Sequence, residues 1–383
     1  MVRTALTNML GIEAPLVGFN RSPAVVAEVS NAGGFGVLGA STFTPAELDA
    51  ALSWIEEQVG GRPYGVDVLV PGHTAQSDPA DLIASLRAQI PQGHRDFVEG
   101  LLERYGIPEL PAGTPTVATD EIASALATGG GGVEALLDVA FSHRISLVAN
   151  ALGPPPPELV SRAKAAGVPV AGLVGQGKHV ANQLEAGVDV LIAQGTEAGG
   201  HTGTVATMVL TPEVIELAGS VPVLAAGGIA SGPQMAAALA LGAAGVWCGS
   251  VWLSSTEEVT GEAVKRKYLE ATSADTVRSP TRTGKPARQL RTAWHDEWDT
   301  LGAPSPLPMP LQPMLVQDAW NRIDAAADAG NEDARALESF FIGQVVGGFR
   351  RLRPTAEITR EIIADCEARL HELARLTATP GEP

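Results

Sequence analysis

Eight short apolar segments recur along the first 250 residues, and most of them end at or beside a glycine. Ala-rich stretches with helical spacing, such as PELVSRAKAAG, lie between most of these segments, so strands and helices alternate. Strands that are apolar on both faces and separated by helices are typical of a parallel sheet with helices packed outside it. Eight such units within about 250 residues predict a (β/α)8 barrel, the TIM-barrel fold of the α/β class. The segments are EAPLVGFN (13–20), GFGVLGAS (34–41), YGVDVLVPG (64–72), RISLVANALG (144–153), VPVAGLVG (168–175), VDVLIAQG (188–195), VPVLAAGG (221–228) and AAGVWCGS (243–250).

A long insertion separates the third strand from the fourth. Residues 72–132 contain an amphipathic helix, HRDFVEGLLERYG, that groups Phe97, Leu101 and Leu102 on one side. Loops that follow barrel strands open on the catalytic face, so we expect this helical insertion to cover the mouth of the barrel.

The C-terminal third exceeds the length that a barrel needs. It contains a helical pattern in EAVKRKYLEA, a basic loop, a Pro-rich stretch, and three further helical patterns. We therefore divide the chain into a barrel (1–265) and a C-terminal helical extension packed on it (266–383). The three helices are expected near residues 314–330, 332–350 and 355–376.

Charge and cysteine usage exclude several classes of protein. Asp and Glu (43) exceed Lys and Arg (26), so the surface repels nucleic acid and anionic membranes. Residues 217–256 carry no charge, but their glycines and prolines favour buried strands and a helix over a membrane span. Cys248 and Cys366 are too few for a disulfide framework, which favours the cytoplasm. Cys248 lies in an apolar run and is expected to be inert, and no metal-ligand motif such as HExxH is present.

The loop after the sixth strand carries the strongest catalytic candidate. Gln194 ends that strand, and the following GTEAGGHTG places His201 between glycines that let backbone approach a ligand. His201 is the only one of the seven histidines in such a place. Because catalytic residues of this fold gather at the carboxyl ends of the strands, we expect His201 to act in catalysis.

Glycine turns follow the last two strands. Gly227 and Gly228 follow the seventh, and Gly249 and Ser250 follow the eighth. These loops form the usual phosphate site of the fold, where backbone N–H groups and a helix dipole hold an anion. One phosphate site without a strand–GxGxxG–helix unit predicts FMN rather than FAD or NAD.

Two further segments are open to more than one interpretation. Pro15 and Leu16, in the first strand, either lie under a flat cofactor ring or belong to ordinary barrel packing. The basic run RSPTRTGKPARQLR (278–291) either pairs internally or captures a nucleotide or coenzyme A phosphate.

Together these motifs resemble the nitronate monooxygenase family of FMN-dependent (β/α)8 enzymes. The likeness lies in AQGTEAGGHTG, VPVLAAGGI, the GS of VWCGS, TGKPARQLR, the early EAPLVG and GQVVGGFRRLRP, and it covers nearly the whole chain apart from the insertion. Leu16 stands where the family often has methionine, and Asn182 where it often has a lysine near the flavin.

The resemblance implies roles for the candidate residues. It implies that His201 is the catalytic histidine, that Gln194 contacts the flavin, and that the two glycine turns with Ser250 hold the FMN phosphate. The implied reaction is oxidation of an alkyl nitronate by molecular oxygen to a carbonyl compound and nitrite. His201 then either abstracts the proton next to a nitro group or, protonated, holds the anionic nitronate.

Other functions stay open from the sequence. An FMN-dependent oxidoreductase acting on an enoyl- or cyclic-ketone coenzyme A thioester fits the same barrel, because fold and cofactor do not fix the substrate. A nucleotide dehydrogenase of the inosine-monophosphate type needs a cysteine in a mobile catalytic loop, and neither cysteine fits that role. A non-catalytic binding role and a homo-oligomer are also compatible with the sequence.

Overall fold

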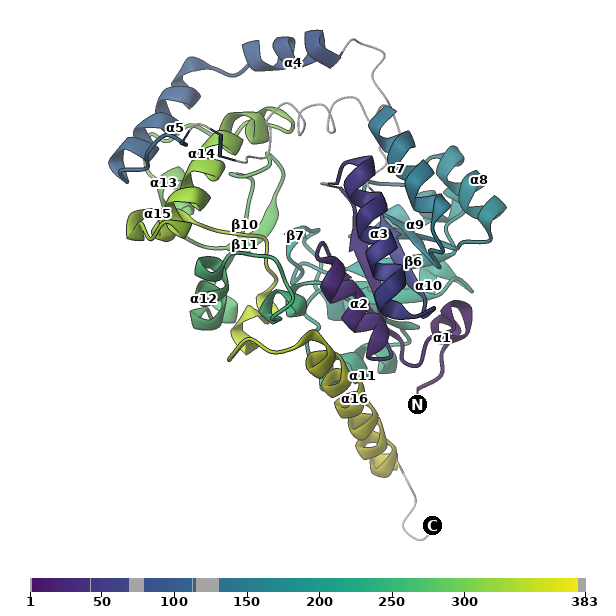
Figure 1. The fold of residues 1–383 in the computed structure, drawn as a ribbon. Helices are drawn as coiled ribbons and strands as arrows, with labels where there is room; N and C mark the ends of the chain where they lie inside the picture. The colour runs from purple at the N-terminus through teal and green to yellow at the C-terminus, as the bar shows by residue number, and fades with distance from the viewer. Residues whose placement is uncertain (1, 42, 69–78, 112, 115–130, 378–383) are drawn as a thin grey trace.

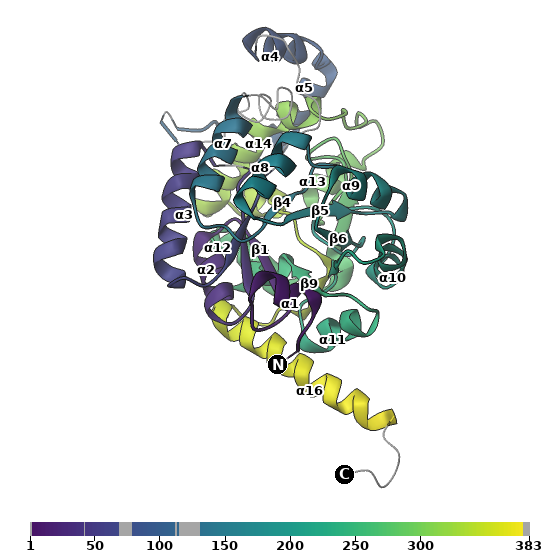
Figure 2. The same cartoon turned by 90° about the vertical axis from the view of Figure 1, so that its right-hand side faces the viewer.

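Eight parallel strands close into a barrel in the computed structural model, which describes residues 2–41, 43–68, 79–111, 113–114 and 131–377 (Figures 1 and 2). Each strand pairs with its neighbour, and the last pairs back with the first. Every predicted apolar segment supplies one strand, so the TIM-barrel prediction is confirmed. The strands are β1 (Leu16–Asn20), β2 (Phe35–Gly39), β3 (Tyr64–Asp67), β4 (Val148–Asn150), β5 (Val170–Val174), β6 (Val190–Gln194), β8 (Val223–Ala226) and β9 (Gly245–Cys248).

A ring of helices surrounds the strands, and the last helix of the chain completes it. α16 packs against both α11 and α2, which is the place of the helix that follows the eighth strand (Figure 2). Residues 249–354 are therefore a long connection between β9 and α16, and the boundary predicted at residue 265 falls inside it. The division into two domains stays a prediction. The ring helices are α2 (Pro23–Asn31), α3 (Pro45–Val59), α7 (Gly131–Ser142), α8 (Pro157–Ala166), α9 (Val180–Ala186), α10 (Thr207–Ala218), α11 (Gly232–Ala240) and α16 (Thr355–Thr377).

The amino-terminal end of the barrel is closed by α1 (Ala5–Leu10). Leu6 and Leu10 are buried in the same apolar cluster as the side chains that fill the barrel interior. The Thr4 hydroxyl donates to the carbonyl oxygen of Ala244, just before β9, at 2.6 Å. The carboxyl end of the barrel is therefore the end left for a ligand.

A second apolar core lies in a helical group that we call the cap, made of α4, α5, α13, α14 and α15. In Figure 1 the cap lies to one side of the barrel helices. The predicted insertion helix is present as α5, where Leu101 and Leu102 are buried and the Phe97 ring meets that of Trp298 at 4.9 Å. The described part of the insertion thus packs on helices of the C-terminal segment, while residues 69–78 and 115–130 lie outside the described residues. The cap helices are α4 (Pro79–Ala88), α5 (Gln92–Arg104), α13 (Ala293–Trp298), α14 (Leu311–Asp328) and α15 (Glu332–Leu337).

The helix predicted over residues 332–350 is wrong in its second half. α15 ends at Leu337, because the chain then runs beside β11, where Leu290 N–H donates to the carbonyl oxygen of Phe340 at 3.2 Å. β11 also pairs with β10 and with β7, a short strand from the loop after β6. The C-terminal segment therefore reaches the mouth of the barrel through this small sheet. Its elements are β7 (Gly200–His201), β10 (Thr276–Ser279) and β11 (Ala287–Leu290), and the remaining helices are α12 (Glu262–Glu270), η1 (Gly177–His179), η2 (Ser250–Ser254), η3 (Ser273–Asp275) and η4 (Gln344–Gly348).

The uncharged stretch 217–256 forms buried strands and a helix, as predicted. It supplies β8, α11, β9 and η2. Within the described part of the chain, every helix is too short or too polar to cross a membrane.

Candidate active site

Aromatic and apolar side chains form the floor of the barrel mouth. Phe19 of β1 and Trp247 of β9 stack with their ring centroids 5.7 Å apart. Gln194 ends β6 two residues after Ile192, which belongs to the interior cluster, so strand alternation turns Gln194 to the same interior face. Its carboxamide has no protein partner within the described residues. A flat apolar floor edged by a free amide suits a planar ring that carries polar atoms at one edge.

The structure does not bring Pro15 and Leu16 to this mouth. Pro15 precedes β1, and its carbonyl oxygen accepts from Val246 N–H near the start of β9. Leu16 is fully buried among side chains of the helix layer outside the barrel. The carboxyl end of the strand is formed instead by Phe19 and Asn20, and Asn20 is the polar residue that ends EAPLVGFN.

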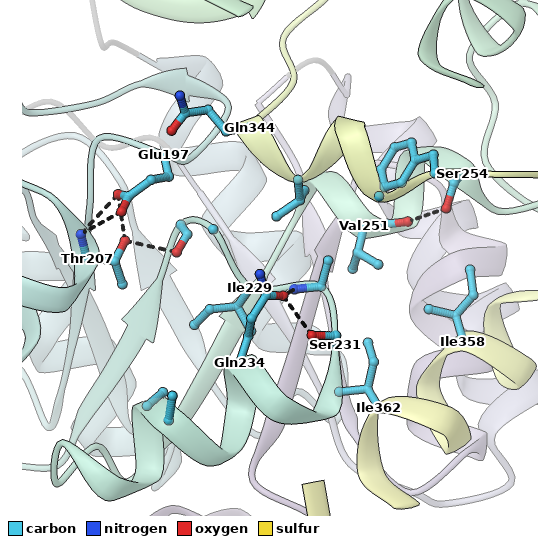
Figure 3. Close-up of a pocket in the computed structure, with 18 of the residues that line it drawn as sticks. Glu197, Thr207, Ile229, Ser231, Gln234, Val251, Ser254, Gln344, Ile358 and Ile362 are labelled. Atoms are coloured by element: carbon cyan, nitrogen blue, oxygen red, sulfur yellow. Dashed lines mark hydrogen bonds between the residues drawn. The ribbon is translucent and has the colours of Figure 1, made fainter. Parts of the chain in front are cut away.

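The turn after β8 is shaped to hold an anion. Gly227 and Gly228 adopt φ values of 94° and 74°, which favour glycine. Within the described chain, their N–H groups and that of Ile229 donate to no protein acceptor. These three residues line a cavity of about 820 Å³ beside the start of α11 (Figure 3). Unpaired donors before a helix are the arrangement that binds a phosphate.

The turn after β9 meets the C-terminal segment beside this cavity. Gly249 approaches the Phe19 ring, and a side chain at Gly249 would contact it at 3.8 Å. Ser250 Oγ accepts from Gly343 N–H at 2.8 Å, so the Ser250 hydroxyl proton is free to face an anion. Gln344, which follows, lines the cavity. Thus the structure brings Gly249 and Ser250 to the same end of the barrel as the Gly227 turn.

Glu197 joins the loop after β6 to the turn after β8. Its carboxylate accepts from Thr207 N–H at 3.0 Å and from the Thr207 hydroxyl at 2.9 Å (Figure 3). The same hydroxyl lies 2.9 Å from the carbonyl oxygen of Gly227. The Glu197 carbonyl oxygen also accepts from Gln344 N–H at 2.9 Å. One residue therefore links three segments of the mouth.

His201 lies in β7, on the loop after β6, and keeps exposed surface. Its Nε2 lies 2.8 Å from the Thr283 hydroxyl oxygen, and its ring lies 6.3 Å from that of Phe341. Surrounding protein lowers the pKa of His201 through desolvation, and the positive charge of Lys285 lowers it further. The imidazole is therefore neutral at pH 7 and able to accept a proton.

The basic run 278–291 pairs internally. Arg278 donates to the Thr202 carbonyl oxygen at 2.9 Å, and Arg288 donates to that of Thr196 at 2.7 Å. Arg282 lies over the Trp320 ring at 4.1 Å, and Arg291 pairs with acidic side chains of α13 and its end. These contacts hold the His201 loop on the C-terminal segment, and they use the arginines that a nucleotide phosphate would need.

Asp67 is a polar group of the mouth that the sequence interpretation missed. It ends β3 and is 6% exposed, and its Oδ1 has no hydrogen-bond partner. Burial raises the pKa of Asp67 to about 7, although Ala151 N–H donates to the carboxylate. The signal in the sequence was a lone acidic residue inside the apolar run YGVDVLVPG.

Cysteine chemistry and metal chemistry each need side chains in a suitable environment. Cys248 is buried, and desolvation raises the pKa of its thiol to about 12, which agrees with an inert role. Among the described residues, no group of His, Cys, Asp or Glu side chains is arranged to hold a metal ion. Asn182 is exposed on α9.

A family model described as nitronate monooxygenase matches residues 3–365. The chain belongs to the nitronate monooxygenase family. Members of this family are flavoenzymes, so the protein is a flavin-dependent oxidoreductase.

Two similar proteins have names that fit membership of the nitronate monooxygenase family. The chain is 52% identical to a putative monooxygenase, Rv1533, of Mycobacterium tuberculosis, over 95% of this chain and 96% of that protein. It superposes on nitroalkane oxidase from Streptomyces ansochromogenes with a TM-score of 0.75 at 26% identity, covering 97% of this chain and all of that one.

A relative named for a different activity is also similar over nearly its full length. The chain is 30% identical to a dehydrogenase of Rhodococcus jostii over 98% of this chain and 99% of that protein. That protein is named (3aS,4S,5R,7aS)-5-hydroxy-7a-methyl-1-oxo-octahydro-1H-indene-4-carboxyl-CoA dehydrogenase.

Proposed function

We propose that the protein oxidises alkyl nitronates with FMN and molecular oxygen, giving a carbonyl compound and nitrite. The observation that carries this proposal is the position of His201 on a loop that Glu197 and Thr207 join to the phosphate turn. Membership of the nitronate monooxygenase family and the likeness to a nitroalkane oxidase support the reaction class.

The residues at the mouth fit FMN. The free N–H groups of Gly227, Gly228 and Ile229 would hold its phosphate, together with the Ser250 hydroxyl. Gln194 would bind a polar edge of the ring. FMN, when bound, supplies the acceptor for the substrate's electrons, which molecular oxygen then removes.

His201 manages the proton and the charge of the substrate. A nitroalkane gives up the proton on the carbon next to its nitro group; that C–H bond breaks, an N–H bond forms on the imidazole, and the electron pair moves to the nitro group. The nitronate and the imidazolium that result attract each other, which keeps the anion in the site. The lowered pKa of His201 keeps the imidazole ready to accept the proton at neutral pH.

Replacing His201 with asparagine tests this role. His201→Asn should keep FMN bound but lower nitrite production from a neutral nitroalkane by about 10²- to 10⁴-fold, the range of a positioned acid-base group. Nitrite release and oxygen uptake measure the turnover, and flavin absorbance after gel filtration measures binding. Unchanged turnover would remove His201 from catalysis, and failure of the wild type to take up FMN would refute the proposal as a whole.

A second candidate is oxidoreduction of a cyclic-ketone or enoyl coenzyme A thioester. It is supported by the full-length similarity to the Rhodococcus jostii dehydrogenase. Incubating the holoenzyme with such thioesters and with nitronates, and comparing the rates of flavin reduction and reoxidation, separates the two candidates.

A further inference from the structure

The ring nitrogens of His201 have different environments. Nε2 lies 2.8 Å from Thr283 Oγ1, whereas Nδ1 has no protein partner among the described residues. The part of the ring that carries Nδ1 is therefore the part left for a substrate.

The Thr283 hydroxyl has one proton and two neighbours that accept one. Its Oγ1 lies 2.9 Å from the Lys285 carbonyl oxygen and 2.8 Å from His201 Nε2. If the proton goes to Lys285, His201 Nε2–H donates to Oγ1 and both contacts are satisfied. If the proton goes to Nε2, the contact with the Lys285 carbonyl oxygen is lost. The first arrangement is therefore the favoured one, and it leaves His201 with its proton on Nε2.

The turn that carries Thr283 is rigid. Gly284 has a φ of 78°, and a side chain there would lie 2.4 Å from Met309 N, so only glycine fits. Pro286 restricts the backbone of Lys285, whose carbonyl oxygen is the acceptor in question. The TGKP of TGKPARQLR thus fixes the Thr283 hydroxyl and its acceptor in one geometry.

We propose that Thr283 is a positioning residue that holds His201 in its Nε2–H tautomer and leaves Nδ1 as the nitrogen that takes the substrate's proton. This inference rests on the proposed function only for the identity of the substrate. In the reaction, the C–H bond of the nitroalkane breaks, an Nδ1–H bond forms, and the electron pair moves to the nitro group. Thr283 keeps its own proton and stabilises the imidazolium by accepting from Nε2–H.

The charged groups around His201 agree with this assignment. Lys285 lies on the turn, Arg288 on β11, which pairs with β7, and Arg278 on β10, the strand beyond β11. The two arginines donate to carbonyl oxygens of Thr202 and Thr196. Lys285 is the group whose charge acts on the imidazole, and it disfavours the doubly protonated ring at rest.

Three threonine variants and a spectroscopic measurement test the proposal. Thr283→Val removes the hydroxyl at nearly constant volume, and Thr283→Ser keeps it. Thr300→Val is the control, because Thr300 is exposed and its hydroxyl also donates to a backbone carbonyl oxygen. Long-range nitrogen–proton spectra of ¹⁵N-histidine protein, with His201 assigned from His201→Asn, report the tautomer without cofactor or substrate. We expect the Nε2–H pattern in the wild type, Thr283→Ser and Thr300→Val, and a mixture of tautomers in Thr283→Val.

Kinetics give the second readout. Thr283→Val should lower kcat/KM for a neutral nitroalkane by about tenfold to a hundredfold, the range seen when a metal-bound histidine loses its outer hydrogen-bond partner. The preformed nitronate needs no proton abstraction, so its kcat should change less, and Thr283→Ser should restore both. An unchanged His201 pattern in Thr283→Val would overturn the proposal even in an active enzyme. If the pattern shifts in Thr283→Val but the wild type does not turn over nitroalkanes, the proposed function is refuted instead.

Discussion

At the residue scale, Asp67 has the environment that departs furthest from that of an ordinary carboxylate. Its pKa is raised to about 7 by burial, so the native protein keeps a proton on Asp67 that the unfolded chain releases near pH 4. The stability that this neutral carboxyl allows is fully present below about pH 4 and is lost as the pH rises toward 7. Above pH 7 the folded protein carries the cost of a buried charge.

Replacing Asp67 with asparagine tests this linkage. Asp67→Asn removes the titration. The free energy of unfolding of the variant minus that of the wild type should therefore rise by roughly 1 to 4 kcal/mol as the pH goes from 4.5 to 8. Urea unfolding of both proteins at the two pH values measures the difference. A constant difference across this range would show that Asp67 is ionised in the native protein throughout.

Some site residues were predictable from the sequence because their signal is local. Gly227 and Gly228 stand directly after an apolar strand, and His201 lies among glycines, so spacing along the chain sufficed to predict that these candidates follow β8 and β6. Thr283 was not predictable, because its contact with His201 joins residues 82 positions apart. The cofactor role predicted for Pro15 does not follow from this local rule, because Pro15 precedes β1 and the mouth lies at the carboxyl end of that strand.

At the element scale, the N-terminal cap of α10 comes from a residue ten positions earlier in the loop that leads into the helix. Ala206 precedes the helix and has no side-chain oxygen, and the Glu197 carboxylate accepts from Thr207 N–H in its place. A capping carboxylate also interacts favourably with the helix dipole. The cap therefore couples the start of α10 to the loop that carries His201.

Removing this cap should loosen the loop more than the barrel. Glu197→Ala should cost about 1 kcal/mol of stability, the usual value of a lost cap, and should speed amide exchange in residues 195–206. Glu216→Ala, which removes an exposed carboxylate from the same helix, is the matched control. Hydrogen exchange by mass spectrometry compares the variants, and equal protection of the loop in both would contradict the role of Glu197.

At the scale of the whole molecule, the chain closes its barrel with its last helix. The eight strands were predictable because each is apolar on both faces. The helix that completes the surrounding ring was not, since α16 follows β9 by more than 100 residues in the chain. Ile358, Ile362 and Cys366 of α16 are buried in one cluster with side chains of α2 and α11. The C-terminal segment thus contributes to the barrel and to the cap.

Truncation tests whether α16 is part of the barrel or a dispensable extension. A chain ending at residue 354 loses the burial of Ile358 and Ile362, about 1.5 to 3 kcal/mol each, and exposes the faces of α2 and α11 that α16 covers. We expect it to lose cooperative thermal unfolding, whereas a chain ending at residue 377 should unfold like the full-length protein. Circular dichroism during heating distinguishes the two, and a cooperative transition in the shorter chain would contradict the place given to α16.

In the proposed function, the flavin takes its electrons from a nitronate. Anaerobic mixing of the FMN-loaded protein with propyl-2-nitronate, and separately with NADH and NADPH, tests it most directly, because flavin absorbance reports reduction without any later step. We predict that the nitronate bleaches the flavin without a nicotinamide and that admitting oxygen restores the absorbance and releases nitrite. A flavin that stays oxidised with the nitronate but is reduced by NADH or NADPH would contradict the proposed function.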